Sequence, residues 1–279
     1  MGMPSLSTIL FNAAGGAVVL AVIGYMGFDL VTTPKVQRCT ERYPAGQQFA
    51  FESIKGQPLS PIELQARAGL REWGVLQNAK IIKNPNAPAG SVLEVALAST
   101  ENEDRVDQNG VGFAWPLAEM PSASSACLSY SVFLPRGFEF KEPGYLPGLY
   151  GAADVAQLDE EQPKDSFAVR MGWAQSGDLG AEIRSPATAG YWQGAGHKLE
   201  WPRGQWVAIE QEVALNTPGE FNGVLRIWVN GALTVDSSNL NLRSAPESTF
   251  TGVVSDIGYA RTASEPGTVQ VSPFIVQWQ

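Results

Sequence analysis

Two paired β-strands are encoded by RGQWVAIEQEVALNTPGEFNGVLRIWVNG, Arg203 to Gly231. In residues 206–215 apolar and polar side chains alternate, which is the period-two pattern of a strand with one buried face. The buried face would carry Val207, Ile209, Gln211, Val213 and Leu215, and the face toward water would carry Ala208, Glu210 and Glu212. After a second run, VLRIWV at 224–229, the pair Asn230-Gly231 predicts a tight type I′ hairpin.

Similar β-branched and aromatic runs recur at 91–97, 128–134, 167–173 and 269–278. With 29 Gly, 19 Pro and only 17% charged residues, the composition suits short strands joined by turns. We therefore predict an all-β protein, an antiparallel jelly-roll β-sandwich over residues 75–279. Residues 34–74 are expected to be a linker with one short helix, which begins at the capping box of Ser60 and Glu63 and ends near Trp73.

The chain begins with an uncharged, mostly apolar run at residues 6–28. A helix of this length crosses a bilayer, so we predict a transmembrane anchor over residues 1–33. A cleavable signal peptide is the alternative, but no basic residue precedes Lys35 and no A-x-A site follows the run. A stripe of small residues suggests packing against other transmembrane subunits, although such residues are common in membrane spans; it comprises Ala13, Ala17, Ala21 and Gly24.

Charge and cysteine content limit the partners and the compartment. A net charge of −9 argues against nucleic acid as a partner. Cys39 and Cys127 could form a disulfide in an oxidising compartment, or could remain unpaired. The only histidine, His197, lies in a glycine-rich turn and is expected to be a solvated loop residue, and we predict no metal and no cofactor.

Three stretches carry a family resemblance: LSYSVFLPRGFEFKEPGYLPGLYG at 128–151, the paired strands at 203–231, and FAVRMGW at 167–173. Over roughly residues 75–279 the chain resembles the alginate-lyase-like family of polysaccharide lyases, which share a "GF-F" turn and a "KLPGL-G" loop. The resemblance implies a jelly roll that binds an acidic polysaccharide and cleaves it by β-elimination. It also favours export, and we expect a periplasmic or extracytoplasmic domain, although the basic residues after the anchor favour a cytoplasmic one.

The groups that the resemblance implies for catalysis are changed here. Elimination needs a base, a cation beside the uronate carboxylate and a proton donor for the leaving oxygen. At the position of the family lysine stands Tyr145, and the strand that would carry a Tyr-x-Tyr pair reads GAEIRSP at 180–186, with Glu182 and Arg184. Arg170 matches a family arginine. If a site survives, it would use Tyr145, Arg170 and Arg184.

Three further residues are candidates for binding a sugar, namely Trp173, Trp192 and Arg226. Exposed tryptophans stack on sugar rings, but large aromatic residues in a sandwich more often fill the core.

Because the chemical groups differ, the sequence favours a non-catalytic accessory subunit of a larger membrane complex, photosynthetic or respiratory, rather than an enzyme. Two alternatives stay open. One is a membrane-tethered carbohydrate-binding module, and the other is a polysaccharide lyase acting on a uronate polymer.

Overall fold

The computed structural model describes residues 36–43, 46–68, 71–97, 109–118, 120, 123–160, 163–195, 198–260 and 266–279. Arg38–Gln279 form a compact unit. The predicted anchor, its stripe of Ala13, Ala17, Ala21 and Gly24, and His197 all lie outside the described residues. Within the described ranges, no helix combines the length and the apolar character needed to cross a membrane.

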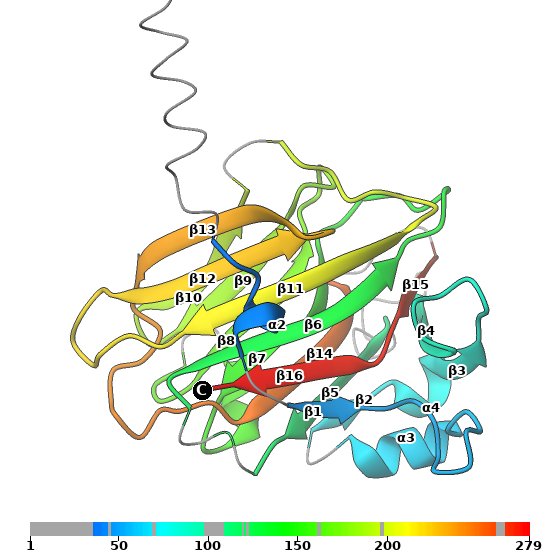
Figure 1. Cartoon of the computed structure of the whole chain (residues 1–279), viewed down its shortest axis with the longest axis horizontal. Coiled ribbons are helices and arrows are strands. Elements are labelled where there is room, and N and C mark those ends of the chain that lie inside the picture. The colour runs from blue at the N-terminus through cyan, green and yellow to red at the C-terminus, as the bar shows by residue number, and fades with distance from the viewer. Residues whose placement is uncertain are drawn as a thin grey trace, which may run out of the picture. The chain divides into compact units, whose positions relative to one another are not determined.

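Two antiparallel sheets pack face to face around one core, which confirms the predicted β-sandwich (Figure 1). In the part of the chain that the structure describes, the larger sheet has nine strands in the order β13-β12-β11-β6-β15-β4-β3, with β16 beside β6 and β1 beside β16. These strands are β1 (Gln47–Phe49), β3 (Ala79–Lys83), β4 (Ser91–Leu97), β6 (Ser125–Phe133), β11 (Trp206–Ala214), β12 (Gly223–Val229), β13 (Ala232–Leu240), β15 (Gly267–Val271) and β16 (Phe274–Trp278).

Seven described strands form the smaller sheet, in the order β10-β9-β8-β7-β14-β5-β2. They are β2 (Glu72–Trp73), β5 (Val111–Pro116), β7 (Gly144–Gly151), β8 (Phe167–Trp173), β9 (Leu179–Ser185), β10 (Thr188–Gly194) and β14 (Gly252–Tyr259). The described helices are short: α2 (Cys39–Arg42), α3 (Pro61–Arg67), α4 (Val75–Asn78) and the 3₁₀ helix η3 (Val155–Asp159).

The predicted hairpin and helix start are both present. Asn230 and Gly231 have φ of 49° and 79°, the left-handed values that a type I′ turn requires. The Ser60 side chain accepts a hydrogen bond from the Glu63 amide, and the Glu63 carboxylate accepts one from the Ser60 amide. This helix, α3, ends at Arg67 and not near Trp73, because Glu72–Trp73 forms β2 and pairs with β5.

Residues that the sequence assigns to a linker contribute to the sandwich from Arg38 onward. β1 pairs with β16, and its Phe49 stacks on Phe113 and Phe274 in the core. Leu64 of α3 is fully buried in the same cluster. From Arg38 onward, the described residues of this predicted linker therefore belong to the same compact unit as the strands that follow.

Alternation along β11 places its apolar face as predicted. Val207, Ile209 and Val213 lie in the core between the sheets. Gln211 is also fully buried there, where it accepts a hydrogen bond from the Leu149 amide at 3.2 Å and donates one to the Val169 carbonyl at 3.1 Å. Its side chain therefore joins the larger sheet to β7 and β8.

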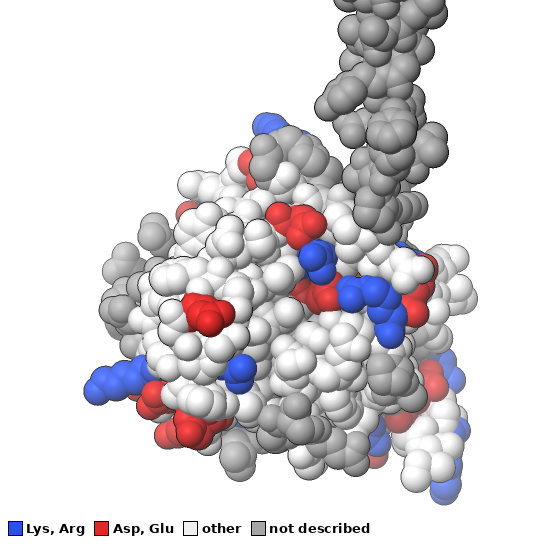
Figure 2. All heavy atoms as spheres, turned by 60° about the vertical axis from the view of Figure 1, so that its left-hand side comes forward, with Lys and Arg blue, Asp and Glu red and all other residues white. Residues whose placement is uncertain are grey.

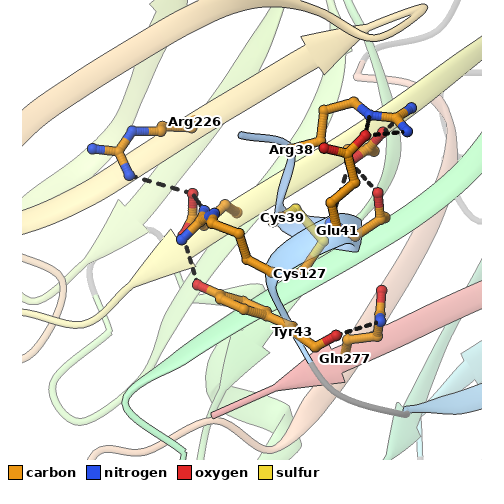
Figure 3. The surroundings of a disulfide bond; sticks show 11 residues. Arg38, Cys39, Glu41, Tyr43, Cys127, Arg226 and Gln277 are labelled. Carbon is orange, nitrogen blue, oxygen red and sulfur yellow. Dashed lines mark hydrogen bonds and ion pairs between the residues drawn. A yellow bond between two sulfur atoms is a disulfide. The ribbon is translucent and has the colours of Figure 1, made fainter. Parts of the chain in front are cut away.

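The other face of β11 is exposed at Ala208, as predicted, but it is covered at Glu210 and Glu212. Helix α2 lies across it and is joined to β6 by a disulfide between Cys39 and Cys127, with the Cα atoms 5.7 Å apart (Figure 3). Beneath α2, Glu210 and Glu212 are 7% and 2% exposed. Each carboxylate is buried because α2 and its flanking residues supply partners for it.

Of the two carboxylates beneath α2, Glu212 makes the shorter contacts. Arg42 lies 2.6 Å from the Glu212 carboxylate, and the Tyr43 hydroxyl donates to it at 2.6 Å. Burial by itself would raise the pKa of Glu212, but these two hydrogen bonds, together with the positive charges of Arg42 and Arg226, lower it. Burial, together with the hydrogen bond to Glu212, raises the pKa of Tyr43 to about 12. The segment around α2 is thus held by a covalent bond and by ion pairs.

Acidic side chains do not form one large patch on the side of the molecule that lies to the left in Figure 1, although the net charge of the chain is −9. From that side most of the surface is uncharged, and acidic and basic side chains lie next to one another (Figure 2).

Candidate active site

The smaller sheet carries its charged residues on the face that points away from the core. In β8, Val169 and Met171 are core residues, so Arg170 between them points outward. In β9, Ala181 and Ile183 face the core, and Glu182 and Arg184 take the opposite face. β8 and β9 are neighbours, with Arg170 directly opposite Glu182 in the register. Arg170, Glu182 and Arg184 therefore share one surface of the smaller sheet.

These residues form a continuous series of ion pairs across the sheet. Arg71 contacts Asp256 of β14 at 2.5 Å, and Arg170 Nε contacts the other Asp256 oxygen at 2.8 Å. Arg170 also lies 3.5 Å from Glu182, which is 3.2 Å from Arg184. Acidic and basic groups alternate along the series, so each buried carboxylate lies between two guanidinium groups.

The 3₁₀ helix η3 fixes the central arginine. Leu158 of η3 packs on Ala168 and Val254 on the outer face of the smaller sheet. The Leu158 carbonyl accepts a hydrogen bond from Arg170 Nη2 at 3.2 Å. The Arg170 side chain is only 4% exposed, whereas that of Arg184 is 23% exposed. Arg184 is thus the more accessible cation for a ligand, and Arg170 mainly holds the carboxylates in place.

Tyr145 lies at the edge of this series. Its hydroxyl is 3.3 Å from Glu182 Oε1, and the Arg170 guanidinium carbon is 5.9 Å from the centre of its ring. Burial, followed by the charge of Glu182, raises the pKa of Tyr145 above its usual value, although Arg184 and Arg170 act in the opposite direction. The phenol therefore keeps its proton at neutral pH and can donate it.

Two pockets meet at Tyr145. The first, which we call the arginine pocket, has a volume of about 530 Å³ and is lined by Arg71, Arg170, Arg184, Asp256 and Tyr259, among others. The second, the tryptophan pocket, has a volume of about 540 Å³ and is lined by Glu142, Trp173, Gln175, Glu182 and Trp192, among others. Tyr145 and Ala260 line both. Each volume lies in the range of ligand-binding pockets.

The sequence profile of polysaccharide lyase family 14 matches residues 86–259. The chain belongs to polysaccharide lyase family 14. No curated protein sequence matches the chain.

Solved structures support the same fold for this family 14 member. The marine PL-14 alginate lyase from Aplysia kurodai aligns with a TM-score of 0.69 and 17% identity over 85% of this chain and 100% of its own. An alginate lyase from a Chlorella virus aligns at 0.60, with 16% identity over 75% and 91%. An endo-β-1,4-glucuronan lyase from the fungus Trichoderma reesei aligns at 0.54, with 9% identity over 76% and 90%.

Family membership overturns the expectation of a non-catalytic accessory subunit. That expectation rested on the residues at Tyr145, Glu182 and Arg184, which differ from the family's lysine and tyrosine pair. The match of the family profile favours the lyase alternative instead. The prediction that the chain leans away from enzymatic activity is therefore not supported.

Of the three residues predicted to bind a sugar, only Trp192 lies in a pocket with part of its ring accessible. Trp192 is half-buried and lines the tryptophan pocket. Trp173 is fully buried and donates from its indole to the Glu142 carbonyl, so its ring offers no face for stacking. Arg226 lies on β12 beside α2, where it pairs with Glu212 at 3.4 Å (Figure 3). This surface belongs to the larger sheet, so the structure does not support ligand binding by Arg226 or stacking by Trp173.

Two residues of the site were missed from the sequence. Arg71 precedes β2, and Asp256 lies 185 positions later in β14. A useful sign was present for Asp256, since a carboxylate within the apolar run GVVSDIGY needs a buried partner. Neither residue falls in the stretches that carry the family resemblance most clearly.

A cluster with metal-like spacing among the described residues is formed by Cys39, Cys127 and Glu210. The two sulfurs are joined in a disulfide, so they are not thiolates and cannot serve as strong metal ligands.

Proposed function

We propose that this protein is a polysaccharide lyase that cleaves a uronic-acid polymer by β-elimination at the arginine pocket. The observation that carries the proposal is the phenol of Tyr145, which lines one pocket with three guanidinium groups and lies 3.3 Å from Glu182. Membership of polysaccharide lyase family 14 supports the reaction class.

The arginines supply the charge that the reaction needs. Removal of the proton at C5 of a uronate places negative charge on its carboxylate, and a cation beside that group stabilises the intermediate. Arg184 is the most exposed guanidinium of the ion-pair series. Burial tends to lower its pKa, but Glu182 and Tyr145 outweigh burial and raise it, so Arg184 stays charged. We assign Arg184 to the substrate carboxylate.

We assign Glu182 as the base and Tyr145 as the proton donor, so that one proton is taken up and one is released in each cycle. Glu182 accepts the proton from C5, the bond between C4 and O4 breaks, and a double bond forms between C4 and C5. Tyr145 donates its proton to O4 of the leaving chain. The proton on Glu182 then passes to the Tyr145 phenolate across their hydrogen bond of 3.3 Å, which restores the starting state.

The test is a panel of uronate-containing polymers, including alginate, glucuronan and hyaluronan, with ultraviolet absorbance of the unsaturated product as the readout. Tyr145→Phe should lower kcat by roughly 10²- to 10⁴-fold, the usual contribution of a positioned proton donor. Tyr191→Phe is the matched control, because Tyr191 is 50% exposed and lies outside both pockets.

Absence of unsaturated product from every polymer with folded protein would contradict the lyase. If the same protein still bound the polymers, the carbohydrate-binding module would be the better description. That second candidate is favoured by one observation, namely that the described carboxylates and guanidiniums of the site are paired with one another.

We also propose that residues 1–33 anchor the domain and that the domain lies on the extracytoplasmic side of the membrane. The disulfide between Cys39 and Cys127 supports this location, because such bonds persist in oxidising compartments. Protease treatment of sealed cells tests it: cleavage of the domain from outside is expected, and full protection would contradict the orientation.

A further inference from the structure

The two pockets that meet at Tyr145 differ in charge. Among its described lining residues, the arginine pocket has three guanidinium groups and one carboxylate, Asp256. The described residues that line the tryptophan pocket include two acidic ones, Glu142 and Glu182, and no lysine or arginine. Glu182 is balanced by Arg170 and Arg184 on the sheet, whereas none of the described lining residues of the tryptophan pocket carries a positive charge that could balance Glu142.

The tryptophan pocket also contains a flat aromatic surface. The Trp192 ring lies against Gly180 of β9, where an added Cβ atom would come within 2.7 Å of the ring. Gly180 has no side chain, so the indole lies directly on the strand. Gly190, which has a φ of +65° and also lines this pocket, leaves the space beside the Glu182 carboxylate open. An indole held in this way offers one face to the C–H surface of a sugar ring.

We propose that the tryptophan pocket binds an uncharged sugar residue, so that the substrate is a mixed polymer in which uronate units alternate with neutral hexose or N-acetylhexosamine units. A second uronate in this pocket would place its carboxylate near Glu142, whose charge no described lining residue balances, and like charges repel in a partly desolvated site. A neutral sugar avoids this repulsion and still stacks on Trp192. The inference rests on the proposed lyase function, because it assigns the uronate to the arginine pocket.

The binding experiment uses Tyr145→Phe full-length protein, which keeps the ligands intact, and titration calorimetry. The probes are a hyaluronan hexasaccharide, which alternates glucuronate with N-acetylglucosamine, and a glucuronan hexasaccharide, which contains glucuronate alone. We expect the alternating ligand to bind more tightly. Adding Glu142→Gln should strengthen glucuronan binding by about fivefold, as removal of one partly exposed like charge predicts. Adding Trp192→Ala should weaken hyaluronan binding by about fivefold through loss of stacking.

Glu139→Gln is the matched control for Glu142→Gln, because Glu139 is a nearby exposed carboxylate that lines neither pocket. Equal or tighter binding of glucuronan by Tyr145→Phe, or an unchanged ratio of the two affinities after Glu142→Gln, would overturn the inference. Its failure is distinguishable from that of the lyase. Rapid cleavage of glucuronan, with no effect of Glu142→Gln, would support the lyase and contradict the mixed substrate. Selective binding of hyaluronan without any unsaturated product would support the mixed ligand and contradict the lyase.

Discussion

Removal of the disulfide between Cys39 and Cys127 should destabilise the domain mainly through its unfolded state. The bond closes a loop with a sequence separation of 88, and in the chain-entropy description a loop of this length restricts the unfolded chain by about 4.6 kcal/mol at 25 °C. In the folded state, α2 retains the ion pair of Arg42 with Glu212 at 2.6 Å and the hydrogen bond of Tyr43 to the same carboxylate. We therefore expect α2 to stay in place.

The assay is urea unfolding followed by tryptophan fluorescence, for the oxidised protein and for the double variant Cys39→Ala/Cys127→Ala. The double variant should lose about 3–5 kcal/mol of unfolding free energy and show a larger m-value, since its unfolded chain exposes more surface. A reducing agent should shift the midpoint of the oxidised protein to that of the double variant. The same agent should leave the double variant unchanged, which is the control.

A loss below about 1 kcal/mol in the double variant would refute this account of the disulfide. It would mean that the unfolded chain already brings α2 and β6 together, or that the bond does not form. An unchanged m-value together with a large loss would place the effect in the folded state instead, in the contacts under α2.

Three further results follow from particular contacts. The lowered pKa of Glu212 means that its ionised form stabilises the fold fully above the unfolded value of 4.5, and that this contribution is lost as pH falls through the folded pKa. Acid titration of the unfolding free energy should show this decline, and Arg42→Met should make it shallower. Gln211→Leu should cost about 1–3 kcal/mol in urea unfolding, because the two backbone groups that Gln211 joins across the sheets lose a buried partner. Gly180→Val should clash with the Gln193 carbonyl and with the Trp192 ring, displace that ring and weaken hyaluronan binding in calorimetry, and its effect on binding should not add to that of Trp192→Ala. Additive effects would show that Gly180 acts elsewhere than on Trp192.

Strand positions could be predicted from sequence where one face alternates or where a short apolar run is bounded by turns. Residues 91–97 and 167–173 coincide with β4 and β8. The run 269–278 was predicted as one strand but forms two, β15 and β16. Pro273 lies at the break, and proline has no amide hydrogen to donate to a neighbouring strand. Periodicity therefore gives the existence of a strand more reliably than its end.

What covers a strand could not be predicted in this way. The alternation in β11 assigns Glu210 and Glu212 correctly to the face away from the core, but it predicts that they meet water. The structure buries both under α2, with the Thr40 hydroxyl donating to Glu210 from 170 positions earlier in the chain. From sequence alone, a charged residue is predicted to be exposed unless its partner is known. Here the partners lie around α2, in a segment that the composition assigns to a linker.

The candidate site was underestimated for a related reason. The resemblance implies a lysine on the loop that forms β7 and a tyrosine pair on the strand that forms β9, and this chain has neither. A comparison of single motif positions therefore suggests that this chain lacks the groups needed for elimination. In the structure β7 and β9 flank β8, and their outward residues converge on Arg170, so that Tyr145 supplies a phenol from β7 and Arg184 supplies a cation from β9. The two kinds of group have exchanged strands while remaining on one face of the sheet. Elimination depends on the groups that surround the uronate and not on the strand from which each comes. For that reason a comparison of motif positions alone did not predict the lyase function that family membership favours.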